Sequence, residues 1–142
     1  MPSDESPALV RAATPEDLDV LERFIAPFVD DGRILPRTKE DLSQLLPTGF
    51  LAELRGDVIG FAALEIYSPK LGEIRSLCVA PLAQGMGIGR KLVSECLQLA
   101  HRRGVFEVMA ITSQDGFFQS CGFDFTLPGE KKALFFPVRD KH

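Results

Sequence analysis

The chain has 142 residues, 45% of them apolar, and a formal net charge of −4. This length fits one domain better than two, and no apolar run approaches the roughly 20 residues that a membrane span needs. The negative charge argues against nucleic acid as a partner. The three cysteines are widely spaced and form no CxxC or His/Cys cluster, so we expect no metal site and a reducing cytoplasm.

The first ten residues, MPSDESPALV, carry two acids and no basic segment, which is not typical of a secretory signal. We expect residues 1–7 to form a short flexible tail. Residues 8–142 are then expected to form a single domain.

A strand followed by two helices is predicted for the first third of the chain. Residues 8–13 are typical of a short strand, and Thr14 and Pro15 are typical of a helix start. The apolar positions Leu18, Leu21, Phe24, Ile25 and Phe28 share one face of that helix. Pro27 should kink or end it near its last turn. A second helix is predicted to start at Thr38 and to stop at Pro47.

The rest of the chain alternates strands and helices. The pattern predicts a hairpin over 49–68 with its turn at Gly56, a strand over 71–80, a helix over 87–103, a strand over 105–112, a helix over 115–122 and a last strand over 133–138. The order is β-α-α-β-β-β-α-β-α-β. It predicts an α/β (α+β) fold with one mixed central sheet flanked by helices.

The segment QGMGIG, residues 84–89, places three glycines between a strand and a helix. Glycine lets a ligand approach closely, and the free N–H groups of a helix start favour a phosphate. Arg90 and Lys91 would add positive charge. The segment lacks the GKS/T of a Walker loop and the third glycine of a dinucleotide fingerprint, but it fits a Q/RxxGxG/A phosphate loop. A flexible connector is the alternative.

The stretches IRSLCVAPLAQGMGIGRKLV (74–93) and GFFQSCGF (116–123) resemble the GNAT family of N-acetyltransferases. The resemblance extends from Ala8 to Val138 in element order. It implies a GNAT-type sheet and acetyl-coenzyme A as co-substrate. It also implies that the strands holding LCV and VMAIT diverge, with the thioester lying between them.

The resemblance implies a set of cofactor-binding residues. Backbone groups of the phosphate loop would bind the pyrophosphate, and those of the LCV strand would bind the pantetheine arm. The set is Leu77, Cys78, Val79, Gln84, Gly85, Met86, Gly87, Ile88, Gly89, Arg90 and Lys91, with Phe117 and Phe118 as a wall.

A narrower likeness points to the acceptor. GRILPRT, FLAELRGDVIGFAAL and YSPKLGEIRSLCV are similar to the acetyltransferase domain of N-acetylglutamate synthases, especially the short bacterial forms without a kinase domain. The likeness implies acetylation of the α-amine of glutamate, at the start of arginine synthesis.

Acyl transfer to an amine requires a base, because an ammonium is not a nucleophile. Glu73 matches the base of the synthase family; the alternative is an exposed strand carboxylate paired with Arg75. Many family members use a tyrosine as the acid where this chain has Phe118. Thr112 and Ser113 are the remaining candidates, or else they are ordinary helix-start hydroxyls. Coenzyme A thiolate is a tolerable leaving group without an acid.

A substrate with two carboxylates favours guanidinium groups as its binding partners. The resemblance points to Arg37 and Ser76, with Arg75 as a second cation and Lys132, beside Lys131, in the C-terminal substrate loop. Each could instead be surface charge or, for Ser76, a small strand residue. The segment GEKKALFFPVRD departs from the family pattern there, which bears on amino-acid specificity.

Two rival functions stay open at this stage. One is acetylation of another amine, such as a polyamine, an antibiotic or a protein N-terminus. The other is a non-catalytic module that binds acetyl-coenzyme A. Cys78 has no neighbouring histidine, so we expect direct transfer rather than a cysteine nucleophile. We expect neither nucleic acid nor membrane as a partner; homodimers are common in the family, although the sequence shows no interface signature.

Overall fold

A computed structural model describes residues 8–125 and 134–138 of the chain. Its sheet has five strands in the order β1-β2-β3-β4-β5. The strands are β1 (Leu9–Ala12), β2 (Gly49–Leu54), β3 (Asp57–Ser68), β4 (Leu71–Val79) and β5 (Glu107–Met109). The helices are α1 (Leu18–Asp30), α2 (Lys39–Leu45), α3 (Ile88–Arg102) and α4 (Asp115–Ser120). Within these described ranges, no helix has the length and apolarity to cross a membrane.

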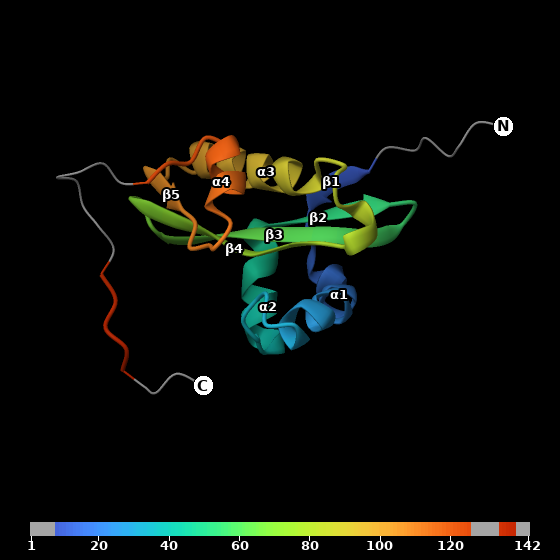
Figure 1. The fold of residues 1–142 in the computed structure, drawn as a ribbon. Coiled ribbons are helices and arrows are strands. Elements are labelled where there is room, and N and C mark those ends of the chain that lie inside the picture. Colours follow the sequence, from blue (N-terminus) through green and yellow to red (C-terminus); the bar gives the residue numbers. More distant parts are fainter. Residues whose placement is uncertain (1–7, 126–133, 139–142) are drawn as a thin grey trace.

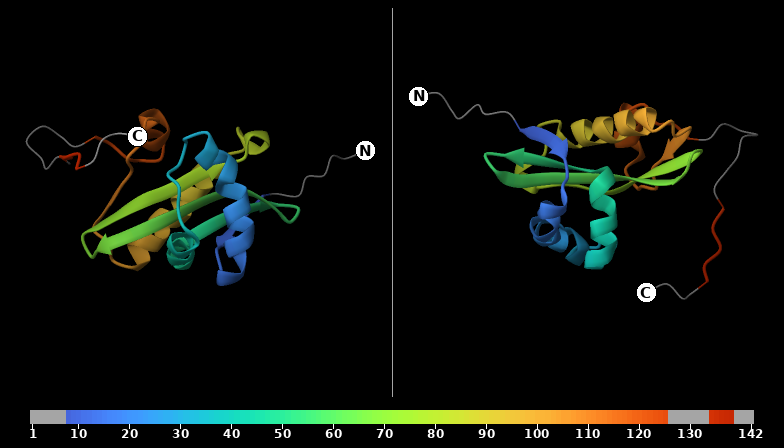
Figure 2. Two further views of the ribbon diagram at one scale, coloured as in Figure 1. Left: turned by 90° about the horizontal axis from the view of Figure 1, so that it is seen from below. Right: turned by 180° about the vertical axis from the view of Figure 1, so that it is seen from behind.

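The sheet is mixed and lies between two helical layers (Figure 1). Its first three strand pairs are antiparallel, whereas β4 and β5 pair in parallel through the α3 crossover. Helices α3 and α4 lie over one face, and α1 and α2 lie over the other (Figures 1 and 2). This arrangement confirms the predicted fold class.

Each face of the sheet has its own apolar core because side chains alternate along a strand. On β3, Leu64 packs with the α3 side chains Leu92 and Val93. The neighbouring Ala63 points to the other face, where it joins Leu21 of α1 and other α1 and α2 residues. The two cores hold β3 and β4 in place between the helical layers.

Local sequence signals explain where the first helices start. The Thr38 hydroxyl accepts a hydrogen bond from the Asp41 backbone N–H at 3.1 Å, as a helix N-cap does. The chain after Thr14 first forms a 3₁₀ turn, Pro15–Asp17, before α1 begins. Pro27 lies in the last turn of α1, which ends at Asp30.

The hairpin between β2 and β3 turns at Arg55 and Gly56, as predicted. Both residues have a positive φ, 52° and 85°. Two such residues match the right-handed twist of the flanking strands.

Two predicted strands differ from the structure. The strand expected over 105–112 is only Glu107–Met109, because its neighbour β4 pairs with it no further than Glu73. The last strand, expected over 133–138, is wrong for the described residues 134–138, which form no strand. They pair with no strand of the described sheet, and their apolar side chains are exposed, Leu134 at 91%. An apolar run forms a strand only where an edge is available to pair with it.

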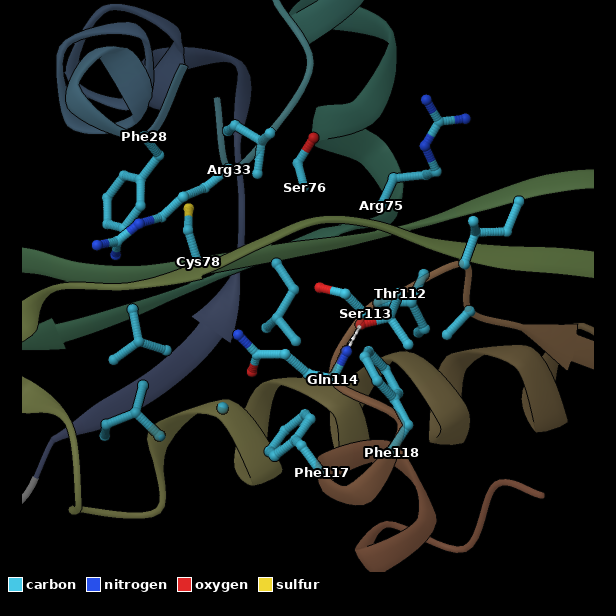
Figure 3. Close-up of a pocket in the computed structure, with 18 of the residues that line it drawn as sticks. Phe28, Arg33, Arg75, Ser76, Cys78, Thr112, Ser113, Gln114, Phe117 and Phe118 are labelled. Atoms are coloured by element: carbon cyan, nitrogen blue, oxygen red, sulfur yellow. Dashed lines mark hydrogen bonds between the residues drawn. The ribbon is translucent and has the colours of Figure 1, made fainter. Parts of the chain in front are cut away.

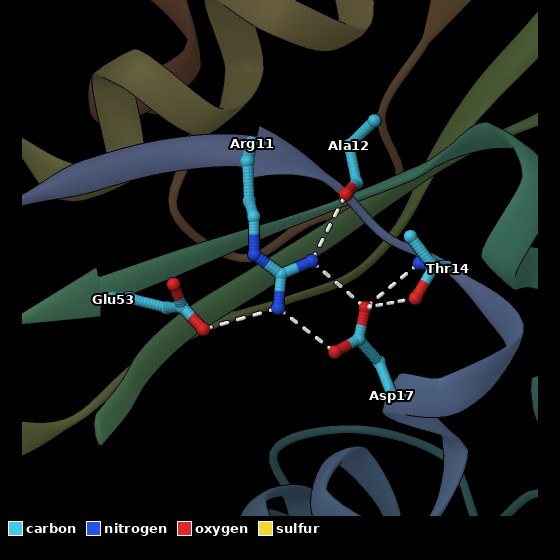
Figure 4. Close-up of polar contacts among 5 residues, drawn as sticks. All are labelled: Arg11, Ala12, Thr14, Asp17 and Glu53. Atoms are coloured by element: carbon cyan, nitrogen blue, oxygen red, sulfur yellow. Dashed lines mark hydrogen bonds and ion pairs between the residues drawn. The ribbon is translucent and has the colours of Figure 1, made fainter. Parts of the chain in front are cut away.

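A part-buried ion pair links β1, the turn that follows it and β2 (Figure 4). Asp17 accepts hydrogen bonds from both terminal nitrogens of Arg11 at 2.8 Å and from the Thr14 backbone N–H at 2.7 Å. Arg11 also donates to Glu53 of β2 at 3.0 Å. The Arg11 guanidinium holds the pKa of Asp17 down to about 2.

We expect Asp17→Asn to lower the free energy of unfolding at pH 7 by about 2 kcal/mol, since the ion pair favours the ionised, folded form. Because the pKa of folded Asp17 lies below its ordinary value of 3.8, this contribution is complete above pH 4 and is lost as the pH falls towards 2. Urea unfolding at several pH values measures it. Asp19→Asn, which removes an exposed partner of Lys39, is the matched control; an equal loss in both variants would contradict the assignment.

Candidate functional site

The site is a cleft that opens where β4 and β5 separate. The two strands pair only at Leu71, Gly72 and Glu73, opposite Glu107, Val108 and Met109. Beyond this point β4 stays paired with β3, while the chain after Met109 leads to α4. The cleft between them has a volume of about 1110 Å³ (Figure 3). The gap that the family resemblance implied is therefore present.

A β-bulge in β4 faces this cleft. Phe61 is paired with Cys78 and Ala63 with Arg75, so Ser76 and Leu77 together lie opposite a single β3 residue. Ser76 has a φ of 57°, which costs a non-glycine residue about 1–3 kcal/mol. The extra residue shifts by one position the order in which β4 side chains alternate between the two faces of the sheet. As a result Glu73, Arg75 and Cys78 all lie on the face that carries α1 and α2.

The glycine-rich segment forms an open loop before α3. Gly85 and Gly87 have φ values of 85° and 76°, and a Cβ added to either would meet no atom within 4 Å. The first helical hydrogen bond runs from the Lys91 N–H to the Gly87 carbonyl. The N–H groups of residues 88–90 therefore have no acceptor within the helix. This geometry suits an oxyanion in the cleft.

One edge of β4 is available to a ligand in the cleft. The Ala80 N–H donates to the Ile59 carbonyl of β3 at 2.8 Å. Since successive residues of a strand direct their N–H and C=O groups to opposite sides, those of Val79 face the open edge. A ligand with amide groups can pair there as an added strand does.

Helix α4 closes the far side of the cleft. Phe117 and Phe118 both line it, and Phe118 is buried. Their rings pack edge to face, with centroids 5.1 Å apart. Arg90 lines the cleft too, and it donates to the Ser120 carbonyl at 2.7 Å and to the Ser120 hydroxyl at 2.9 Å. Arg90 thus links the first turn of α3 to the end of α4.

Most residues expected at the cofactor lie together. Those that line the cleft are Leu77, Cys78, Val79, Gln84, Gly85, Gly87, Ile88, Gly89, Arg90, Phe117 and Phe118. Met86 and Lys91 are exposed and do not line it.

Glu73 is a buried carboxylate at the point where the strands separate. Glu73 is 7% exposed, so it is not the exposed strand carboxylate that was the alternative to a base. It does lie beside Arg75, as that alternative expected. Arg75 Nη1 is 3.4 Å from Glu73 Oε1 and 3.0 Å from Glu65 Oε1. The hydroxyl of Tyr67 donates to Glu73 Oε1 at 2.5 Å.

Sequence reasoning gave Tyr67 no place in the site. The signal that could have found it is the hairpin register, which pairs Glu65 with Glu73 and puts residue 67 on the same face.

Cationic side chains gather on the α1–α2 side of the cleft (Figure 3). Arg37 lines it and donates to the Ser76 hydroxyl at 3.3 Å. Arg33 and Phe28 also line it, and the guanidinium carbon of Arg33 is 6.0 Å from the Phe28 ring centre. Neither was predicted. Arg33 is the second residue of the quoted stretch GRILPRT, so its place in that stretch was the available signal.

Three further candidates can be placed. Thr112 and Ser113 line the cleft, and the Thr112 hydroxyl accepts a hydrogen bond from the Gln114 N–H at 2.8 Å. That bond lies before α4 and does not cap it, because the N-cap of α4 is Gln114 and it has no side-chain cap hydrogen bond. The bond leaves the Thr112 hydroxyl proton free to donate. Burial raises the pKa of the Cys78 thiol to about 12, so it is not a thiolate near neutral pH.

The predicted substrate-loop lysines, Lys131 and Lys132, lie outside the residues that the structure describes.

Known proteins resemble the chain over most of its length. An uncharacterized N-acetyltransferase of Chlorobaculum tepidum is 35% identical over 114 residues, which cover 80% of this chain and 74% of that protein. An amino-acid acetyltransferase of Mycobacterium tuberculosis is 32% identical over 126 residues, covering 86% and 71%.

A solved structure shares the fold. N-acetylglutamate synthase from Neisseria gonorrhoeae, complexed with coenzyme A and N-acetyl-glutamate, superimposes with a TM-score of 0.72 at 27% identity. The match covers 83% of this chain and 28% of the synthase chain. This chain therefore corresponds to only part of that larger protein.

The family assignment rests on a direct match. Residues 16–123 match the model of the acetyltransferase (GNAT) family, and this range includes the cleft strands, the glycine loop and α4. The expectation of an acyltransferase with acetyl-coenzyme A as co-substrate is confirmed. The chain belongs to the GNAT family of acetyltransferases.

Proposed function

We propose that this acetyltransferase transfers the acetyl group to the α-amine of a small acidic amino acid, with glutamate as the first candidate. The observation that carries the proposal is the charge of the cleft. Arg33, Arg37 and Arg75 line its α1–α2 side, whereas Glu73 is the one carboxylate among the described lining residues. The amino-acid acetyltransferase and N-acetylglutamate synthase among the similar proteins support the same acceptor class.

Arg37 is the best-placed of these cations to bind an acceptor carboxylate. Arg75 is already shared between Glu65 and Glu73. Arg33 is 3.9 Å from Asp31. Arg37 has no carboxylate partner within residues 8–125 or 134–138, and its one side-chain hydrogen bond there, to Ser76, uses Nε. Its two terminal nitrogens are free for a bidentate contact.

The α3 side of the cleft suits the coenzyme. The loop from Gln84 to Gly89 would bind the pyrophosphate through backbone N–H groups, and the open edge of Val79 would bind the amide groups of the pantetheine arm. The thioester would then lie between β4 and the segment 110–114, close to Glu73.

Glu73 would act as the general base. It takes a proton from the acceptor ammonium, the free amine attacks the thioester carbonyl, and the C–S bond breaks to release the thiolate. Thr112 could donate its hydroxyl proton to the leaving group. The coenzyme A thiolate can also leave without a proton donor, because the pKa of a free thiol is near 8.5.

The acceptor is tested by following thiol release from acetyl-coenzyme A with glutamate, glutamine, other amino acids and polyamines. We expect glutamate to be preferred, and Arg37→Ala to raise its KM by about 10- to 100-fold with little change in kcat, because a charged hydrogen-bond pair is lost. Arg23→Ala, an exposed change on α1 outside the cleft, should leave both constants unchanged. Preference for a polyamine would overturn the acidic acceptor.

Replacement of the proposed base should affect kcat. We expect Glu73→Gln to lower kcat by about 10²- to 10⁴-fold, the usual contribution of a general base. The dissociation constant for acetyl-coenzyme A, measured by calorimetry, should stay unchanged. Wild-type kcat in this variant would remove Glu73 from the mechanism.

The phosphate loop is tested with a matched pair of glycine variants. Gly87→Ala places a Cβ in open space beside the expected pyrophosphate, so we expect coenzyme A affinity to fall by about tenfold or more. Gly56→Ala has the same kind of backbone strain, at a φ of 85°, but lies in the β2–β3 turn. Calorimetry should show unchanged coenzyme A binding in that control; an equal loss in both variants would refute a local role for the loop.

A further inference from the structure

Tyr67 forms a polar cluster with the proposed base on the uncovered end of the β3–β4 hairpin. Its hydroxyl is 2.5 Å from Glu73 Oε1 and 3.0 Å from Arg75 Nη1. Glu65 Oε1 is farther from it, at 3.4 Å. Tyr67 does not line the cleft, and it is the one tyrosine in the sequence.

The donors and acceptors fix the direction of these hydrogen bonds. A phenol has one proton to donate, and a guanidinium can only donate. Arg75 therefore donates to the Tyr67 oxygen, and Tyr67 donates its proton to the much nearer Glu73. Burial and the hydrogen bond to Glu73 raise the pKa of Tyr67, so the hydroxyl keeps its proton throughout the pH range of an enzyme assay.

The two oxygens of Glu73 have different surroundings. Oε1 accepts from Tyr67 and lies 3.4 Å from Arg75. Oε2 makes no hydrogen bond or ion pair with any residue that the structure describes. Since Glu73 lines the cleft, Oε2 is the oxygen left for an acceptor ammonium.

We propose that Tyr67 is a positioning residue for Glu73: its hydroxyl holds Oε1, which leaves Oε2 to take the proton of the acceptor. This inference rests on the proposed role of Glu73 as the base. Tyr67 acts through Glu73 and does not touch the substrate.

Tyr67→Phe removes the hydroxyl and keeps the ring. We expect kcat near neutral pH to fall by about tenfold, the effect of one hydrogen bond to a charged group, with the acceptor KM unchanged. Ser68→Ala, which removes the neighbouring hydroxyl that accepts from the Lys70 N–H, should leave both kcat and KM unchanged.

The double variant Tyr67→Phe/Glu73→Gln separates this inference from the proposed function. If Tyr67 acts through Glu73, the double variant is no slower than Glu73→Gln alone. A slow Glu73→Gln with a Tyr67→Phe rate equal to wild type would overturn the role of Tyr67 and leave the base assignment intact. A double variant slower than Glu73→Gln alone, together with a lower Tm for Tyr67→Phe, would show a merely structural residue. Wild-type activity in Glu73→Gln would overturn both.

Discussion

The separation of β4 from β5 is the constraint on which the site depends. Parallel pairing needs two strands in register, and here it ends after three residues at Glu73 and Met109. On one side of that point, β4 keeps an unpaired edge with the backbone groups of Val79 exposed to the cleft. On the other side, residues 110–114 line the same cleft. A longer β5 would fill the edge at which we propose that the coenzyme binds, so the short strand is part of that proposal.

The bulge in β4 adds a second constraint. It keeps Glu73 and Arg75 on the face of α1 and α2 while Cys78, three positions after Arg75, packs in the core of that same face. Without the extra residue, side-chain alternation along β4 would place either Cys78 or the pair Glu73 and Arg75 on the face of α3. Ser76 has a strained backbone at this point, and its hydroxyl accepts from Arg37 of the loop between α1 and α2. Backbone strain and the contact with the proposed acceptor-binding arginine thus coincide at Ser76.

Much of the fold could be predicted from the sequence because its signals are local. The cap at Thr38, the turn at Gly56 and the glycines before α3 depend on residues a few positions apart. The glycine loop was predicted for the same reason, and the role of Glu73 was predicted through a family resemblance. The limits of β5 depend on where β4 bends away, which is a contact between distant segments. An apolar run such as 134–138 carries no information about whether an edge is available to it.

The same limit applies to the polar surroundings of Glu73. Tyr67 and Glu73 are six positions apart, and only the antiparallel register of β3 and β4 brings them together. Arg75 was expected to bind substrate, yet it is paired with Glu65 and Glu73. A buried carboxylate without hydrogen-bond donors is costly, and a cation and a hydroxyl at one of its oxygens reduce that cost. The β3–β4 hairpin therefore supplies the polar partners of Glu73. In our proposal, one carboxylate oxygen of Glu73 is held by these partners and the other is left to react with the acceptor.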